Sequence, residues 1–276
     1  LYSGSALMAS LYAAVHSSLG KSMAMQTSTS LFWVERLRYC RRLSTNLSSR
    51  VDSRRGSEHN VSMIERYTRK EMGRIWTDAN RFAIWMEIEL TAAEAMEAQG
   101  LIPAGIAAGL RAKAWTPDED DVADIARIEA ERKHDVIAFL THLERRMGPE
   151  ARYLHLGMTS SDVLDTCLAV QLNESAALIQ QGLADLMQVV ARRARQHKNS
   201  LMVGRTHGIH AEPTTFCLVL ALWYAELGRQ AERLEAARKS VAVGKLSGAV
   251  GTFAHLPMEV EAEVCDRLGW NPEPIS

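Results

Sequence analysis

The sequence predicts an all-α protein in which a small helical domain precedes a bundle of long helices. Two segments, 162–198 and 214–242, carry apolar residues at steps of three and four, which places those residues on one face of a helix. No segment shows the sustained alternation of polar and apolar residues that indicates a half-buried strand. Two helices of this length that pack antiparallel are typical of a helical bundle.

Composition limits the classes of function. Apolar residues make up 47% of the 276 residues, which is enough for a sizeable core, and a net charge of -1 argues against a general nucleic-acid-binding surface. No run of 18 or more apolar residues occurs, so we expect no membrane span. The four cysteines lie far apart with no metal-type spacing, which indicates buried thiols in a reducing compartment and no metal site.

Residues 1–62 differ from the rest of the chain. They hold eight Lys/Arg and three Asp/Glu, are rich in serine, and lack a sustained hydrophobic period. The composition permits an organelle-targeting extension. We favour the alternative of an upstream segment or an incomplete gene model without a fold of its own, because it has no apolar stretch that could offset the entropy of ordering. We therefore expect 1–62 to be a disordered extension.

From Met63 onward the pattern becomes helical. Apolar residues at steps of three and four predict a helix that runs from Ile75 to near Gly100, followed by a short helix over 104–113. Acidic residues over 118–121 favour a helix start, since the helix dipole stabilises negative charge there. That helix leads toward His134, and a further helix over 135–147 stops at Gly148-Pro149.

The second half is organised around the stretch 204–216, which joins the two long helices. Here two histidines, an arginine and a glutamate meet in a turn, and Pro213 is expected to begin the second helix. Upstream, 152–161 reads as a loop that turns at Gly157 and caps the first long helix. The glycine-rich stretch 244–252 lacks the order of a phosphate-binding loop and has no strand before it, so we expect a tight connection between bundle helices.

Five stretches carry a family resemblance. They are Met63-Ile64-Glu65-Arg66-Tyr67, Lys133-His134-Asp135-Val136, Gly157-Met158-Thr159-Ser160-Ser161-Asp162-Val163, the joint Arg205-Thr206-His207-Gly208-Ile209-His210-Ala211-Glu212-Pro213-Thr214-Thr215-Phe216, and Gly244-Lys245-Leu246-Ser247-Gly248-Ala249-Val250-Gly251-Thr252. In this order they resemble the adenylosuccinate lyase family, within the fumarase/aspartase superfamily. The resemblance covers about Met63 to Ser276 and implies an N-terminal helical domain over 63–161 and an incomplete central bundle over 162–276.

The resemblance implies a carbon–nitrogen lyase of purine biosynthesis. Such an enzyme cleaves adenylosuccinate to AMP and fumarate, and cleaves the analogous succinylated imidazole-carboxamide nucleotide. The family uses no metal or organic cofactor and forms homotetramers whose active sites combine several subunits, and we expect a cytoplasmic location. Sister enzymes such as argininosuccinate lyase, aspartase, fumarase and the muconate-cycloisomerising branch share the bundle and are the alternative within the class.

A β-elimination needs an acid, a base and donors that hold a dianionic intermediate. By resemblance, His207 is the proton donor to the leaving nitrogen and His134 assists it. The same resemblance makes Thr159 and Ser160 donors to a substrate carboxylate, and Arg66 and Tyr67 nucleotide contacts. Lys133 and Asp135 are further substrate contacts that the resemblance implies. His210 orients either the loop or a substrate group.

Lys133 departs from the arginine common in the family and loses bidentate geometry. The family's base is a serine on a Ser-Ser-x-Met-Pro-x-Lys loop, and this pattern does not occur in the 276 residues. The sequence therefore names no base, and we expect the isolated chain to be inactive. The competing interpretation is a non-catalytic helical module that pairs with full-length subunits.

Overall fold

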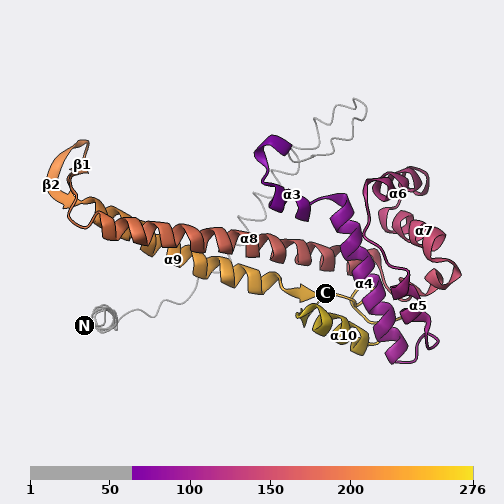
Figure 1. Ribbon diagram of the computed structural model, residues 1–276. Coiled ribbons are helices and arrows are strands. Elements are labelled where there is room, and N and C mark those ends of the chain that lie inside the picture. Colours follow the sequence, from indigo (N-terminus) through magenta and orange to yellow (C-terminus); the bar gives the residue numbers. More distant parts are fainter. Residues whose placement is uncertain (1–63, 276) are drawn as a thin grey trace, which may run out of the picture. The chain divides into compact units, whose positions relative to one another are not determined.

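The computed structural model describes residues 64–275, which fold mainly into α-helices. The extension predicted for 1–62 lies outside the described residues. The all-α fold class is confirmed, although two small two-stranded sheets, which the sequence pattern did not predict, accompany the helices. Figure 1 shows two long helices side by side, with a strand hairpin at one end and the shorter helices at the other. Within the described range, no helix combines the length and apolar character that crossing a membrane requires.

The described chain begins with three helical segments: the 3-10 helix η1 (Glu65–Tyr67), α3 (Lys70–Ile75) and α4 (Asp78–Ala98). The single helix predicted from Ile75 onward is thus interrupted at Trp76 and Thr77. The Thr77 hydroxyl accepts a hydrogen bond from the backbone N–H of Asn80 at 3.2 Å and caps α4. The indole N–H of Trp76 donates to Ser175 Oγ at 3.1 Å, which ties this junction to the first long helix.

Four short elements follow: α5 (Ile106–Ala112), α6 (Glu119–Arg132), α7 (Asp135–Met147) and the 3-10 helix η2 (Pro149–Tyr153). The helices predicted over 104–113, after 118 and over 135–147 are therefore confirmed, whereas η2 extends into the expected loop. Asp118 and Asp121 form a capping box at the start of α6, as its acid-rich sequence indicates. Within α6 and α7, Asp121 and Asp124 contact the two ring nitrogens of His142 at 3.0 and 2.8 Å, which joins the two helices.

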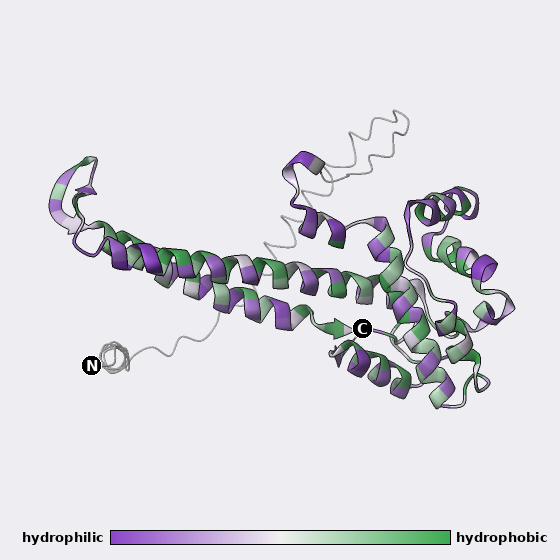
Figure 2. Cartoon of the chain, viewed as in Figure 1, coloured by the Kyte–Doolittle hydropathy of each residue, from purple (hydrophilic) through white to green (hydrophobic). Residues whose placement is uncertain are grey.

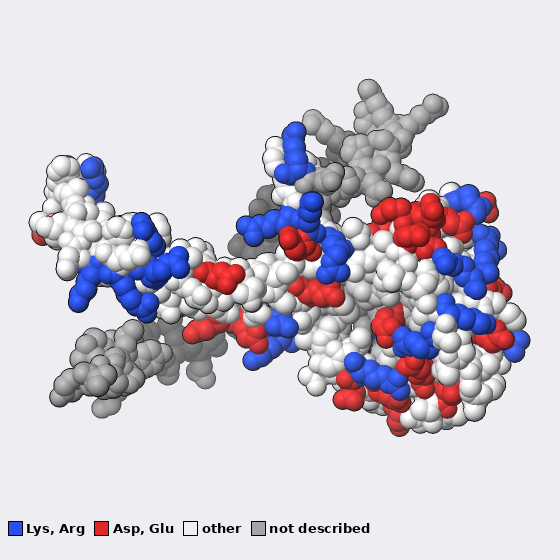
Figure 3. Space-filling view, viewed as in Figure 1, with Lys and Arg blue, Asp and Glu red and all other residues white. Residues whose placement is uncertain are grey.

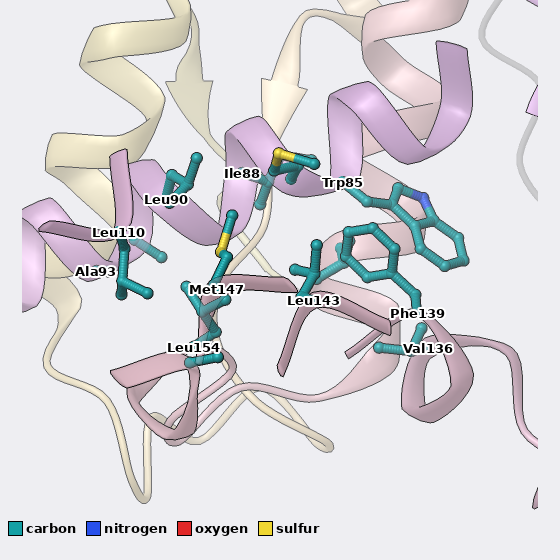
Figure 4. Packing of buried hydrophobic residues seen from close by; sticks show 14 of the residues in the cluster. Trp85, Ile88, Leu90, Ala93, Leu110, Val136, Phe139, Leu143, Met147 and Leu154 are labelled. Carbon is teal, nitrogen blue, oxygen red and sulfur yellow. The ribbon is translucent and has the colours of Figure 1, made fainter. Parts of the chain in front are cut away.

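One hydrophobic core links α4, α7 and the start of the first long helix (Figure 4). Its aromatic part is Phe82, Trp85 and Phe139, with ring centroids 5.3 to 5.7 Å apart in edge and stacked arrangements. Burial of each such side chain contributes about 1.5–3 kcal/mol. The core also includes Val163 and Cys167, and burial raises the pKa of the Cys167 thiol to about 12. Packing therefore crosses the boundary predicted at 161/162, and that division of domains stays a prediction.

The two long helices are α8 (Ser160–Gln196) and α9 (Phe216–Val241), joined by the hairpin of β1 (Leu201–Thr206) and β2 (Ile209–Thr215). Across the helix pair, the Arg238 guanidinium donates to Asn173 Oδ1 at 3.0 Å and to Gln180 Oε1 at 2.9 Å. Figure 2 shows apolar residues recurring along both helices, and several of them are exposed. The larger ones are Leu168, Leu172, Leu178, Ile179, Leu186, Val189, Leu218, Leu222, Trp223 and Tyr224.

The last described elements are β3 (Val243–Gly244), α10 (Met258–Leu268) and β4 (Asn271–Pro272), of which β3 and β4 pair in parallel. The sequence analysis did not predict α10. This helix packs against α4, where Arg267 forms an ion pair with Glu94. The stretch 244–252 is consequently a loop between β3 and α10 that returns to the core through Leu246, and the predicted connection between bundle helices is wrong.

Candidate active site

The N-terminus of α8 carries the first group of candidate residues. Thr159 precedes the helix, and its backbone N–H donates to Asp162 Oδ2 at 2.9 Å, which is one half of a capping box. Asp162 is fully buried. Thr159 is the N-cap of α8 and Asp162 completes the capping box, which confirms that this stretch caps the helix, whereas Ser160 is already the first helical residue. The Thr-Ser-Ser-Asp motif is therefore a rigid helix start, which is a suitable place for backbone and hydroxyl donors to an anion.

The glycine-rich loop 244–252 is held against this helix start by the same carboxylate. Asp162 Oδ1 accepts hydrogen bonds from Lys245 Nζ at 2.7 Å and from the backbone N–H of Ser247 at 3.2 Å. Behind the loop, Glu261 accepts from the backbone N–H of Leu246 at 2.8 Å, while burial raises the pKa of that carboxyl group. Two motifs more than 80 residues apart in the sequence thus meet at one buried carboxylate.

His134 and Ser160 lie next to each other at this end of the molecule. His134 is the N-cap of α7, where its Nδ1 accepts the backbone N–H of Ile137 at 3.4 Å, and its Nε2 lies 3.4 Å from Ser160 Oγ. Asp135 Oδ1 lies 3.3 Å from Nδ1 of the same ring. The structure therefore brings His134, Asp135, Thr159 and Ser160 together, beside the exposed Lys133 at positive φ.

Arg66 and Tyr67 form a separate group on η1. Both side chains are exposed, and the Arg66 guanidinium lies 4.8 Å from the centre of the Tyr67 ring. Within 64–275 neither side chain forms a hydrogen bond or ion pair with the group around His134. Their predicted contact with a nucleotide is therefore not tested by the arrangement of this chain alone.

His207 lies in the tight turn between β1 and β2. His207 and Gly208 are the two turn residues, both with positive φ (50° and 75°), and Thr206 pairs with Ile209 across them. Two positive φ values are the requirement of the type I′ turn that matches the twist of a hairpin. Gly204 is needed for a different reason, because a Cβ there would lie 2.6 Å from the carbonyl oxygen of Glu212.

The hairpin corrects two expectations about the joint between the long helices. The stretch was expected to be a turn without strands, but it forms an antiparallel pair of strands. Pro213 was expected to begin the second helix, but it lies in β2 opposite Val203. Helix α9 begins at Phe216, three residues later. Proline is tolerated here because an edge strand has a free N–H side.

A single copy of the chain cannot bring His134 and His207 together. His134 contacts Ser160 at the first residue of α8, whereas the hairpin that carries His207 follows the last residue of α8. Helix α8 has 37 residues, which at 1.5 Å per residue makes it about 55 Å long. The hairpin that carries His207 and the start of α8, which contacts His134, therefore lie at opposite ends of α8 (Figure 1).

Comparison with known proteins assigns the chain to a family. A family model described as a lyase matches residues 65–273, which is most of the chain and nearly the whole described range. The chain belongs to this lyase family. All candidate residues, from Arg66 to His207, lie inside the matched range.

Two curated relatives of this chain are named adenylosuccinate lyase. One is from Staphylococcus saprophyticus, 46% identical over 214 residues, and the other from Synechocystis, 49% identical over 214 residues. In both comparisons the match covers 78% of this chain and 49% of the relative, so the chain spans about half the length of the curated relatives it matches.

Solved structures of the superfamily have the same fold as this lyase chain. A fumarate lyase from Mesorhizobium matches with a TM-score of 0.70 and 29% identity, over 74% of this chain and 49% of its own. A 3-carboxy-cis,cis-muconate lactonizing enzyme from Pseudomonas putida matches with a TM-score of 0.69 and 28% identity, over 76% and 49%. The helical-bundle fold is thereby confirmed.

The structure adds His155, which the sequence analysis did not single out. Its backbone N–H donates to Glu89 Oε2 at 2.7 Å, and its ring Nδ1 lies 2.6 Å from Glu89 Oε1. Glu89 is fully buried in α4, and His155 has a positive φ of 60°. A carboxylate at Nδ1 leaves Nε2 as the atom available to a ligand. The signal in the sequence was a histidine two residues before Gly157, in the loop that leads to Thr159.

Proposed function

We propose that the protein acts as an adenylosuccinate lyase, which releases fumarate from adenylosuccinate to leave AMP and also cleaves the succinylated imidazole-carboxamide nucleotide. The observation that carries this proposal is the separation of His134 and His207 by the length of α8, together with 46–49% identity to curated adenylosuccinate lyases. A site that needs both histidines is complete only where copies meet. The exposed apolar residues of α8 and α9 support such an assembly.

In this proposal, His207 of one copy protonates the leaving nitrogen in a pocket formed around His134 of another. Thr159, Ser160 and the start of α8 hold a carboxylate of the substrate through hydroxyl and backbone N–H donors. Arg66 and Tyr67 contact the nucleotide, with Arg66 suited to the phosphate, and Lys133 and Asp135 flank His134. The reaction requires no metal or organic cofactor, and no residue of this chain is assigned as the base.

The assembly is proposed to be a homotetramer, and the cytoplasmic location also stays a prediction. A different fumarate-releasing or lactonizing activity is the second candidate, since solved relatives include a fumarate lyase and a muconate lactonizing enzyme. Their identity of 28–29% is much lower than that of the adenylosuccinate lyases, which favours the purine substrate.

The test is an assay of mixed assemblies. The chain is co-expressed with full-length S. saprophyticus adenylosuccinate lyase inactivated at its counterpart of His207, and fumarate release from adenylosuccinate is measured. A chain that supplies the missing acid restores turnover by about 100-fold or more over the inactive enzyme alone. If the two proteins co-purify and no turnover returns, the assembly-module interpretation replaces the enzymatic one.

A further inference from the structure

Two regions of opposite charge lie at opposite ends of the long helices (Figure 3). Residues 189–233, which include the end of α8, the hairpin and the start of α9, hold seven Lys/Arg and three Asp/Glu. Residues 118–132, which form α6 and its cap, hold seven Asp/Glu and two Arg. This distribution is local, since the whole chain has a net charge of only -1.

The basic region is exposed, and no ion pair within residues 64–275 neutralises its charges. We call the following exposed residues the tip patch: Arg192, Arg193, Arg195, Lys198, Arg205, Arg229 and Arg233. Within residues 64–275 none of them forms an ion pair, and the two whose side chains donate hydrogen bonds do so to the neutral amides of Gln196 and Gln230. Arg192 and Arg195 are three residues apart on α8 and therefore share a face of the helix.

The acidic residues of α6 divide into an inner and an outer set. The inner residues Asp121 and Asp124 contact the ring nitrogens of His142 and form ion pairs with arginines of α6 and α7. The outer set, which we call the α6 patch, consists of Glu119, Asp120, Glu129 and Glu131. All four are exposed, and no ion pair within the described chain involves them. The contacts of His142 thus join α6 to α7, while the four residues of the α6 patch stay exposed.

The two patches flank the two halves of the proposed site. Glu131 precedes His134 by three residues, and Arg205 precedes His207 by two. When His207 of one copy approaches His134 of another, the tip patch of the first copy comes close to the α6 patch of the second. We propose that these patches dock on each other, so that opposite charge guides the hairpin of one copy onto α6 of a second copy. This inference rests on the proposed function only in placing His207 near His134.

Charge docking and apolar association respond oppositely to salt. Pairs of exposed charges are screened as the Debye length falls from about 10 Å at 0.1 M to about 3 Å at 1 M salt, whereas burial of the apolar faces of α8 and α9 does not weaken. The dissociation constant of the assembly of this chain, measured by analytical ultracentrifugation, should therefore rise about tenfold between low and high sodium chloride. Assembly that strengthens with salt, or a chain that stays monomeric throughout, would overturn the proposal.

A charge-reversal pair makes the test specific. One variant carries Arg192→Glu and Arg195→Glu, and the other carries Glu129→Lys and Glu131→Lys. In each variant alone, like charges face each other at the docking surface, so its dissociation constant should rise about 10- to 100-fold. In a mixture, each tip meets an α6 of opposite charge, so mixed assemblies should form while neither variant associates with itself. Differently labelled variants identify these mixed assemblies.

A matched control separates docking from a change in net charge. Lys70→Glu with Arg74→Glu makes the same change in charge on exposed residues of α3, neither of which forms an ion pair within the described range. This control should assemble like the unmodified chain. Equal weakening in the control and the tip variant, or no rescue in the mixture, would contradict the proposal. Neither result depends on fumarate release, so the docking of the patches and the proposed activity are tested separately.

Discussion

Lys245 Nζ lies 2.7 Å from Oδ1 of the fully buried Asp162, and this contact joins the glycine-rich loop to the start of α8. The Lys245 side chain is itself only 16% exposed. A buried carboxylate that loses its counter-charge keeps its desolvation cost, so its partner matters more than a surface partner would.

Lys245→Met should lower the free energy of unfolding by about 3 kcal/mol, measured by urea denaturation, because Asp162 would remain buried without a cation. The control is Lys239→Met, which removes a partner of Glu235 from an exposed ion pair. That change should cost less than about 1 kcal/mol. Equal losses in the two variants would mean that the Asp162 contact contributes no more than a surface pair.

Acid should weaken the junction of α6 and α7. The hydrogen bond from His142 lowers the pKa of Asp124, and hydrogen bonds led by Trp115 lower that of Asp121 although burial opposes them. A carboxyl group with a lowered pKa stabilises the fold above its unfolded value of about 3.9 and loses that effect as pH falls through the folded value. Unfolding free energy measured below pH of about 4 should therefore fall, and Asp124→Asn should reduce this dependence. An unchanged pH profile in the variant would contradict the account.

Glu261 should behave in the opposite way, because burial raises its pKa. A raised carboxyl pKa favours the fold below the unfolded value of about 4.3 and loses this benefit as pH rises through the folded value. Glu261→Gln keeps an oxygen for the backbone N–H of Leu246 without the buried charge. The variant should be as stable as the unmodified chain or more stable at pH 7, and this advantage should shrink at low pH. A large loss of stability at pH 7 would show that the hydrogen bond to the carboxylate outweighs its burial.

Two glycine substitutions should have effects of opposite sign. Gly157 has a φ of 75°, and a Cβ there would lie 2.6 Å from the carbonyl oxygen of His255. Gly157→Ala should therefore destabilise the fold by at least about 1–2 kcal/mol. Gly109 lies inside α5 with open space around it, so Gly109→Ala should stabilise by about 0.5–1 kcal/mol. Thermal denaturation of both variants tests the pair, and a neutral Gly157→Ala would mean that the loop relaxes away from His255.

Local patterns predicted the helices well because the information lies in neighbouring residues. Helix α7 begins after His134, which caps it, and ends at Gly148-Pro149. The approximate bounds of α8 and α9 follow from the helical period of their apolar residues. The hairpin was missed because its strands are short, largely exposed and interrupted by Pro213, so no buried face imposes alternation on the sequence. Helix α10 was missed because its partner is α4, and only the fold brings these two together.

The candidate site divides in the same way. The adjacency of His134 and Ser160 joins residues 26 positions apart and could not be read from the sequence, although the motifs named both residues. His155 was missed because its significance depends on Glu89, which is 66 residues away and buried. The separation of His134 from His207 could have been calculated, since a helix predicted over 162–198 already implies about 50 Å or more.

The central claim is that His207 and His134 of one chain serve different active sites. The most direct measurement uses the mixed assembly with the relative inactivated at its counterpart of His207, and compares chains that carry His207→Gln or His134→Gln. The account predicts that His207→Gln lowers the restored fumarate release by about 100-fold or more. It predicts that His134→Gln leaves the release unchanged, because the relative supplies its own counterpart of that residue. Equal loss in both variants, with both chains still co-purifying, would contradict the claim.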